Sequence, residues 1–225
     1  MSKTLVITGA SRGIGREVVQ LASAAGHIVY ALSRHINPIQ KTPLVHPIAM
    51  DITDENALSV FAGQLQKEQI QIDALINNAG ALLNKPFRET TAEDFDTVFR
   101  VNVFGLANLT RMMLPFIDTK GHVLNISSMG GLGGSAKFPG LSAYSSSKGA
   151  VNILTELLAE EYKESGPAFN ALALGAVQTE MLEQAFPGFQ APVSANEMGT
   201  YVLKFALAGQ QFFNGKILPV SSSTP

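Results

Sequence analysis

Cysteine is absent from this chain, and charged side chains make up only 15% of its 225 residues. Without cysteine, the chain can have no disulfides, no thiolate nucleophile and no thiolate-bound metal. The net charge of −2 gives no electrostatic reason to bind nucleic acid or an anionic membrane surface. No stretch approaches the ~20 apolar residues that a membrane span needs, and the first residues do not resemble a signal peptide. These absences predict a soluble, cytoplasmic, globular protein.

Apolar side chains make up 46% of the residues, enough to bury a sizeable core. Short apolar runs alternate with longer segments of helical periodicity. The predicted strands cover residues 4–8, 28–33, 44–50, 74–77, 122–127, 168–174 and 216–220. The predicted helices cover residues 13–25, 55–68, 92–116, 142–165 and 196–208. Because the strands are continuously apolar, they predict a parallel sheet buried on both faces. We expect one α/β domain over residues 1–225, with a doubly wound sheet of about seven strands.

A glycine-rich turn joins the first predicted strand to the first predicted helix, in "LVITGASRGIGREV". Gly9, Gly13 and Gly15 let the backbone turn tightly and approach a pyrophosphate, which then lies at the helix N-terminus. A tight strand–helix turn favours glycine for structural reasons as well. The position of this turn at the first strand–helix junction favours a dinucleotide site.

Three further motifs follow strands or begin a helix. "INNAG" (residues 76–80) and "NISS" (125–128) end two predicted strands, and adjacent asparagines there can hydrogen-bond neighbouring loops. In "AYSSSKGAVN", Tyr144 and Lys148 stand four residues apart and therefore share one face of a helix. Taken alone, that decapeptide also fits an ordinary amphipathic surface helix. The carboxyl ends of parallel strands meet at one edge, so these motifs should converge there.

Together the motifs resemble those of the classical short-chain dehydrogenase/reductase family over nearly the whole chain. They are "TGASRGIG" (8–15), "MDITD" (50–54), "NNAG" (77–80), "VNVFG" (101–105), "NISS" and "YSSSK" (144–148), in this order. The resemblance implies a Rossmann-like fold, a nicotinamide cofactor, and a small carbonyl or alcohol substrate. It also implies hydride transfer.

The resemblance assigns a catalytic role to four residues. Tyr144 would be the general acid/base, and Lys148 would lower its pKa and hold the nicotinamide ribose. Ser128 would hydrogen-bond the substrate oxygen, and Asn102 would anchor a water that links Lys148 to solvent. Ser127 is an alternative to Ser128, but strand alternation places the two serines on opposite faces. An ammonium ~4 Å from the phenol contributes roughly 4 kcal/mol at an effective dielectric constant of 20, so we expect a lowered tyrosine pKa.

The resemblance also implies a cofactor-binding set. Asp51 and the Ile52 backbone would meet the adenine, the backbone after Asn77 the adenosine ribose, and Val177 and Thr179 the nicotinamide half. The full set is Gly9, Ser11, Arg12, Gly13, Ile14, Gly15, Arg34, Asp51, Ile52, Asn77, Ala79, Gly80, Tyr144, Lys148, Val177 and Thr179.

The end of the second strand predicts NADP(H) rather than NAD(H). NAD enzymes of this fold place an acidic residue there, whereas this chain has Ser33 followed by Arg34. Arg12, in the glycine turn, can approach the same 2′-phosphate, and two guanidiniums form charge-assisted bonds to it. The alternative is that both arginines are simply solvated.

The chain departs from the family pattern at two places. A long glycine-rich loop, residues 130–140, separates Ser128 from Tyr144, and Leu174 stands where a proline is usual. We expect the loop to lie beside the substrate. The predicted apolar lining is Met129, Phe138, Leu141, Met181, Phe186 and Phe189, although aromatic loop residues are also typical of lid packing.

Histidine spacing gives no indication of a metal site. The spacing of the four histidines does not match that of ligands to one metal ion. We therefore expect structural or solvated roles, and no metal, for His27, His35, His46 and His122. Two other functions stay open: a non-catalytic nucleotide-binding sensor or scaffold on the same fold, and an epimerase or dehydratase.

Helices 92–116 and 142–165 are richer in apolar residues than one sheet face requires. Such self-complementary faces suit closed symmetry, and they predict a homodimer or homotetramer. The serine-rich end of the chain leaves the choice between the two open.

Overall fold

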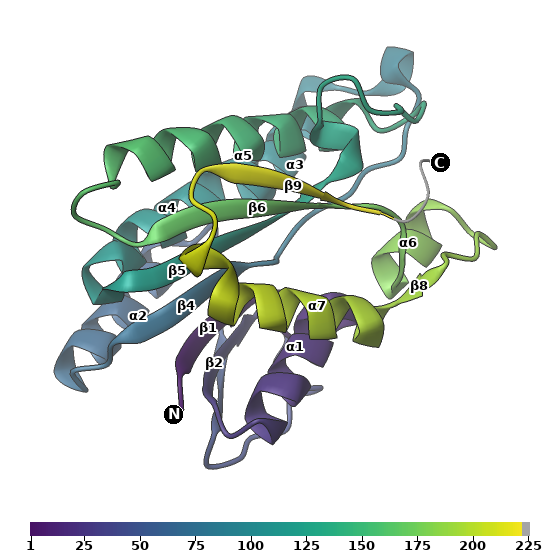
Figure 1. Cartoon of the computed structure of the whole chain (residues 1–225). Coiled ribbons are helices and arrows are strands. Elements are labelled where there is room, and N and C mark those ends of the chain that lie inside the picture. Colours follow the sequence, from purple (N-terminus) through teal and green to yellow (C-terminus); the bar gives the residue numbers. More distant parts are fainter. Residues whose placement is uncertain (222–225) are drawn as a thin grey trace.

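A seven-stranded parallel sheet forms the centre of the computed structural model, which describes residues 1–221 (Figure 1). Its strand order is β3-β2-β1-β4-β5-β6-β9. The bounds are β1 (Thr4–Thr8), β2 (Ile28–Ser33), β3 (Val45–Ala49), β4 (Ile72–Asn77), β5 (Ile117–Ser128), β6 (Ala168–Leu174) and β9 (Lys216–Val220). The order reverses between β1 and β4, so the predicted doubly wound, Rossmann-like fold is confirmed.

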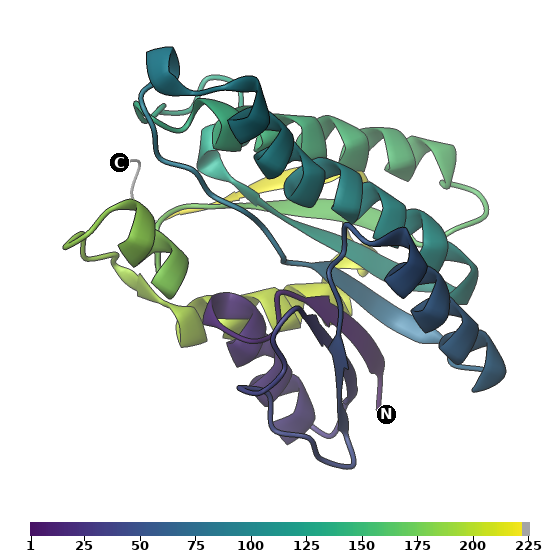
Figure 2. The ribbon, with the colours of Figure 1, turned by 180° about the vertical axis from the view of Figure 1, so that it is seen from behind.

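Helices cover both faces of the sheet, as Figures 1 and 2 show from opposite sides. One face packs against α1 (Gly13–Ala24) and α7 (Ala195–Ala208). The other packs against α2 (Glu55–Lys67), α4 (Leu106–Met113) and α5 (Ser142–Glu161), and α3 (Ala92–Phe99) lies against α5. Two separate apolar clusters therefore sandwich the sheet, which is why its inner strands are apolar on both sides.

Edge strands differ from central strands in burial and in composition. β1 and β6 are almost wholly buried, whereas β3 and β9 are only partly so. Each edge strand contains a proline, Pro47 in β3 and Pro219 in β9. Proline donates no ladder hydrogen bond, so it suits an edge and discourages pairing with a further strand.

The predicted continuous helix over 92–116 is wrong. α3 gives way to a π-helix over Arg100–Gly105, then to α4, and finally to a 3₁₀ turn over Leu114–Phe116. A Cβ on Gly105 would lie 2.9 Å from Ile52 Cγ1, so the helix approaches the β3–α2 loop closely at the π-helix. Pro115 stands at the start of the 3₁₀ turn. At the start of α3, Thr91 and Asp94 form a full capping box.

A small lobe near the carboxyl end of the sheet was missing from the sequence prediction. It contains α6 (Glu180–Ala185) and a two-stranded sheet of β7 (Val177–Gln178) and β8 (Val193–Ser194). Figure 1 shows this lobe beyond the ends of β6 and β9. Among residues 1–221, no helix is both long enough and apolar enough to span a bilayer. The serine-rich end beyond Ser221 lies outside the described residues.

Candidate active site

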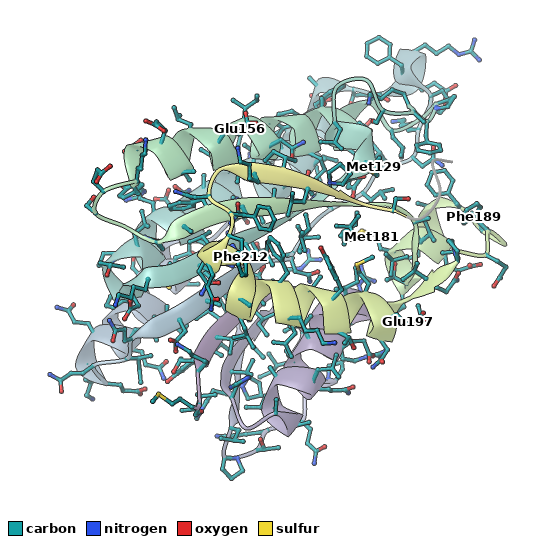
Figure 3. The ribbon with its side chains drawn as sticks, in the orientation of Figure 1. Met129, Glu156, Met181, Phe189, Glu197 and Phe212 are labelled. Carbon is teal, nitrogen blue, oxygen red and sulfur yellow. The ribbon has the colours of Figure 1, made fainter. Side chains whose placement is uncertain are left out.

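A cavity of about 660 Å³ opens at the carboxyl ends of the sheet strands. Its walls come from the loops after β1, β2, β3, β4, β5 and β6 and from α6. Figure 3 labels three lining residues, Met129, Met181 and Phe189, at the end of the sheet next to α6. Ligands of open α/β sheets bind at such a switch point.

The glycine turn after β1 is shaped by backbone contacts. Gly9 has a positive φ of 65°, and a Cβ there would lie 2.8 Å from Asn78 Nδ2. A Cβ on Gly15 would meet the Gly9 carbonyl oxygen. Both positions therefore require glycine, as the sequence predicted from the turn alone.

The loop after β4 holds this turn in place. Asn78 Nδ2 donates to the Thr8 carbonyl at 2.9 Å, and Thr8 Oγ1 accepts from the backbone N–H groups of Asn78 and Ala79. Thr8 and Asn78 are thus positioning residues that the predicted set omitted. The adjacent asparagines of "NNAG" were the signal that could have found Asn78.

Two of the helix N-termini at the cavity have no side-chain cap. α2, α3, α6 and α7 begin with side-chain caps, from Asp54, Thr91, Thr179 and Ser194. α1 and α5, whose first turns line the cavity, have no side-chain cap, and α1 has no acidic residue in its first turn. Uncapped N–H groups carry a partial positive charge. Together with the glycine turn, they fit the pyrophosphate of a dinucleotide.

The β2 end of the cavity carries the two arginines that the cofactor prediction depends on. Arg12 and Arg34 are exposed and line the cavity, and Ser33 Oγ donates to Ser11 Oγ at 2.8 Å. Asp51, after β3, lines it too. Burial raises the pKa of Asp51, but hydrogen bonds from Thr53 and the charge of Arg34 outweigh this and lower it. Asp51 is therefore ionised at neutral pH.

Tyr144 and Lys148 lie on α5 and face the same cavity, as the spacing predicted. Lys148 Nζ donates to the Ile126 carbonyl at 2.7 Å and lies 5.8 Å from the Tyr144 ring centroid. Burial lowers the pKa of Lys148 to about 8. Burial raises the pKa of Tyr144, and a hydrogen bond with Ser128 only partly opposes this. The expected lowering of the tyrosine pKa is therefore wrong for the chain by itself, because desolvation outweighs the hydrogen bond with Ser128.

The two serines at the end of β5 face different partners. Ser128 forms the hydrogen bond with Tyr144, and its Oγ also accepts from the Gly130 N–H at 3.2 Å. Ser127 is buried, and its Oγ donates to the Lys148 carbonyl at 3.4 Å. Ser128 is thus the serine whose hydroxyl stands beside the phenol.

Asn102 and Asn77 do not line the cavity. Asn102, fully buried in the π-helix, accepts from Ala81 N through Oδ1 and donates to Ser147 Oγ and the Ala81 carbonyl through Nδ2. Both polar atoms of the side chain have hydrogen-bond partners, which hold it in place within the π-helix. Asn77 turns inward from the end of β4 and donates to Thr110 and Asn125. The prediction for Asn77 concerns the backbone that follows it, where Ala79 and Gly80 line the cavity.

Most of the predicted set does converge. The predicted residues that line the cavity are Gly9, Ser11, Arg12, Gly13, Ile14, Arg34, Asp51, Ile52, Ala79, Gly80, Ser128, Tyr144, Lys148, Val177 and Thr179. Gly15 stands behind the turn and acts through packing. All six predicted apolar lining residues are also present, and Leu32, His35, Leu82, Val101 and Leu182 join them. Leu174 stands where the family usually has a proline. The backbone N–H of the next residue, Gly175, donates to the Val220 carbonyl in β9 at 3.0 Å, and this bond holds the turn.

The histidines have structural surroundings. His122 is buried, with Nδ1 near the Ala206 carbonyl and Nε2 near Asn170, and His46 stacks on Tyr30. Within the described residues, no group of three or more histidine or acidic side chains is arranged to hold a metal ion.

Comparison with known proteins gives the same family along the sequence and in the fold. The family model described as short chain dehydrogenase matches residues 3–188. The oxidoreductase BOA17 of Botryotinia fuckeliana is 33% identical over 190 residues, which cover 80% of this chain and 68% of that protein. Carbonyl reductase (NADPH) 2 of Sus scrofa is 34% identical over 163 residues, which cover 69% and 64%.

A solved structure of 4-hydroxyisoleucine dehydrogenase complexed with NADH superposes with a TM-score of 0.88 at 23% identity, covering 99% of this chain and 98% of that one. That likeness extends the agreement in fold to the whole sheet and its helices. The two kinds of comparison and the cavity agree that the chain belongs to the short-chain dehydrogenase/reductase family of nicotinamide-dependent oxidoreductases.

Proposed function

We propose that this chain is an NADP(H)-dependent oxidoreductase that interconverts a carbonyl compound and a secondary alcohol, with Tyr144 as general acid/base. The observation that carries the proposal is the convergence of Tyr144, Ser128 and Lys148 on the same cavity as the glycine turn. The nicotinamide, when bound, supplies or accepts the hydride, and the protein contributes orientation and a proton.

Tyr144 is suited to donate a proton in the direction of carbonyl reduction. Its raised pKa keeps the phenol protonated at neutral pH. Ser128, hydrogen-bonded to that phenol, can steady the substrate oxygen that receives the proton. With a pKa of about 8, Lys148 is mostly cationic at pH 7 and stabilises the phenolate left behind. The lysine charge therefore acts mainly after the proton has moved.

The preference for NADP(H) rests on charge at the β2 end. Arg12 and Arg34 are exposed at the cavity wall, and Ser33, which cannot repel a phosphate, is bonded to Ser11. The Sus scrofa relative is named for NADPH, which agrees with this reading. Each hydrogen bond to a charged group contributes roughly 1.5–3 kcal/mol.

We also propose a homo-oligomer built on the face of α5 that points away from the sheet. Ile153 and Leu157, one helical turn apart on α5, are 66% and 60% exposed. Phe104, in the π-helix that precedes α4, is 54% exposed. Apolar groups in such a row suit a two-fold interface. Light scattering at micromolar concentration should give at least a dimer mass, and Ile153→Glu with Leu157→Glu should lower it. A monomer mass for the unaltered chain would contradict this proposal.

The function is tested with purified protein, a panel of ketones, aldehydes and secondary alcohols, and both cofactors. Absorbance of the reduced nicotinamide should change with at least one substrate, and faster with NADP(H). Cofactor binding without turnover of any panel member would favour the nucleotide-binding sensor. Altered product without net change in the cofactor would favour an epimerase or dehydratase.

A further inference from the structure

Resting on the function proposed above, we infer that the substrate is an uncharged carbonyl compound with an apolar body, bound between the β5–α5 loop and α6. The inference concerns the part of the cavity beyond Ser128 and Tyr144. Its walls are apolar on three sides: Leu82 follows β4, Met129, Phe138 and Leu141 follow β5, and Met181 and Phe186 come from α6 and its end. Apolar walls around one or two polar groups are typical of small-molecule sites.

The charged groups of the cavity are unevenly distributed. Arg12, Arg34 and His35 follow β1 and β2, and Asp51 follows β3, all on the side of the glycine turn. Lys148 is committed to the Ile126 carbonyl beside Tyr144.

Glu180, in the first turn of α6, also faces the glycine turn. Its Oε1 lies 3.7 Å from Arg16, and a Cβ on Gly13 would lie 3.6 Å from its Oε2. Within residues 1–221, no cation of the 129–141 loop or of α6 lines the cavity.

The cations nearest along the chain to these walls have other hydrogen-bond partners and do not line the cavity. Lys137, in the loop after β5, points Nζ at Ser135 Oγ, 2.7 Å away, and does not line the cavity. Lys85, beyond Leu82, forms an ion pair with Asp94 at 2.6 Å. A carboxylate or phosphate on the substrate would lose water at these apolar walls without gaining a cation. Burying a charge without a partner is strongly unfavourable.

Hydrogen bonds between the three segments make these walls a preformed enclosure. Asn84 Nδ2 donates to the Ala185 carbonyl at the end of α6 at 2.8 Å. The Lys85 N–H donates to the Gly140 carbonyl at 2.9 Å, and Gln178 Oε1 accepts from the Ala191 N–H at 2.8 Å. These hydrogen bonds therefore hold the apolar side chains around the space next to Ser128, in a shape that suits an apolar body.

A matched substrate series tests the inference. 4-Methylcyclohexanone, 4-oxocyclohexanecarboxamide and 4-oxocyclohexanecarboxylate share one ring and differ in charge and polarity, and 2-octanone with 7-oxooctanoate gives an open-chain pair. Within the ring series, we expect kcat/KM to fall from 4-methylcyclohexanone to the amide to the carboxylate, by roughly 100-fold between the first and the last. Turnover of the carboxylates at equal or higher kcat/KM would overturn the inference and leave the proposed function standing.

A cation introduced at the apolar wall provides the second test. Phe186→Arg places a cation on the α6 side and should narrow the gap between ketone and carboxylate by about tenfold or more. Phe186→Leu is the matched control and should keep the gap. Circular dichroism and the affinity for reduced cofactor show that each variant is folded, and Met181→Lys replaces Phe186→Arg if the latter is not. An unchanged gap in a folded cationic variant would overturn the inference. If the unaltered chain turned over no member of the carbonyl panel, the proposed function itself would be overturned.

Discussion

The two halves of the cavity are built in different ways. The nucleotide half lies at the carboxyl ends of β1, β2 and β3 and is made largely of backbone. It contains Gly9 in a left-handed conformation, the uncapped N-terminus of α1, and backbone N–H groups that donate to Thr8. The substrate half lies between the carboxyl ends of β5 and β6 and helix α6. It is made of apolar side chains on loops that are joined by a few hydrogen bonds. Backbone geometry tolerates few residue types, whereas a loop side chain can change without disturbing the sheet. The nucleotide half is therefore constrained, and the substrate half is free to set specificity.

Loss of the proton donor should have the largest effect and should be confined to chemistry. We expect Tyr144→Phe to lower kcat by roughly 10²–10⁴-fold, because a positioned acid/base group contributes that much. The ring remains, so the affinity for reduced cofactor, measured by fluorescence titration, should change little. Tyr201→Phe, outside the cavity, is the control and should keep full turnover. Near-normal kcat in Tyr144→Phe would show that another group supplies the proton.

Charge reversal at the β2 end should act on the nucleotide half alone. Arg34→Asp should reduce the preference for NADPH over NADH by about 100-fold, since it removes a charge-assisted bond and adds a repulsive carboxylate. The ratio of kcat/KM values for the two cofactors measures this, and kcat at saturating cofactor should change less. Arg88→Asp makes the same charge change at an 88% exposed side chain away from the cavity. Equal ratios in the unaltered chain and in Arg34→Asp would refute the role of the arginine.

Acid should weaken the packing at the end of β5 and β6 that lies opposite the cavity. His122, between β5, β6 and α7, is buried in its neutral form, with its pKa lowered to about 4 by desolvation. Because the folded pKa lies below the unfolded value, this stability is fully present above about pH 6.5 and is lost as pH falls toward 4. Denaturant unfolding should show a loss of about 2 kcal/mol between pH 7 and pH 5 from this group. His122→Gln should flatten that slope, and an equally steep slope in the variant would assign it to other groups.

The smallest effect on kinetics is expected from removing the single hydrogen bond that joins Asn84 to the end of α6. Asn84→Ala removes the donor to the Ala185 carbonyl and should raise KM for a ketone about 2- to 13-fold, which corresponds to one net hydrogen bond. Cofactor affinity should stay the same, in contrast to Arg34→Asp. Asn84→Asp keeps the size and the acceptor but loses the donor, so it should behave like Asn84→Ala. If Asn84→Asp retained a normal KM, packing of the side chain against Gly140, rather than the bond, would be the cause.

The parts of the fold that the sequence predicted well are those with local causes. All seven strands of the main sheet were predicted, because runs such as Leu5–Ile7 in β1 must be buried wherever the chain folds. The glycine turn was readable for a similar reason, since Gly9 needs a backbone shape that other residues rarely adopt. The pair of Tyr144 and Lys148 was readable from helical spacing.

The misses have non-local causes. The helical period continues through 92–116, but contacts of Gly105 with Ile52 and of Asn102 with Ala81 accompany a π-helix there. α6 is a short helix that carries a Thr179 cap and is held from outside by Asn84. Neither feature has a strong period of its own.

Chain pattern by itself determined the parallel sheet, the nucleotide turn and the candidate catalytic residues, because apolar runs, glycine backbone freedom and helical spacing act over a few residues. Only the tertiary structure decided that Asn77 and Asn102 face the interior, and that a lobe around α6 closes the apolar half of the cavity. It also decided that burial raises the pKa of Tyr144 rather than lowering it. These outcomes depend on desolvation and on hydrogen bonds between segments tens of residues apart, which no local stretch of sequence specifies.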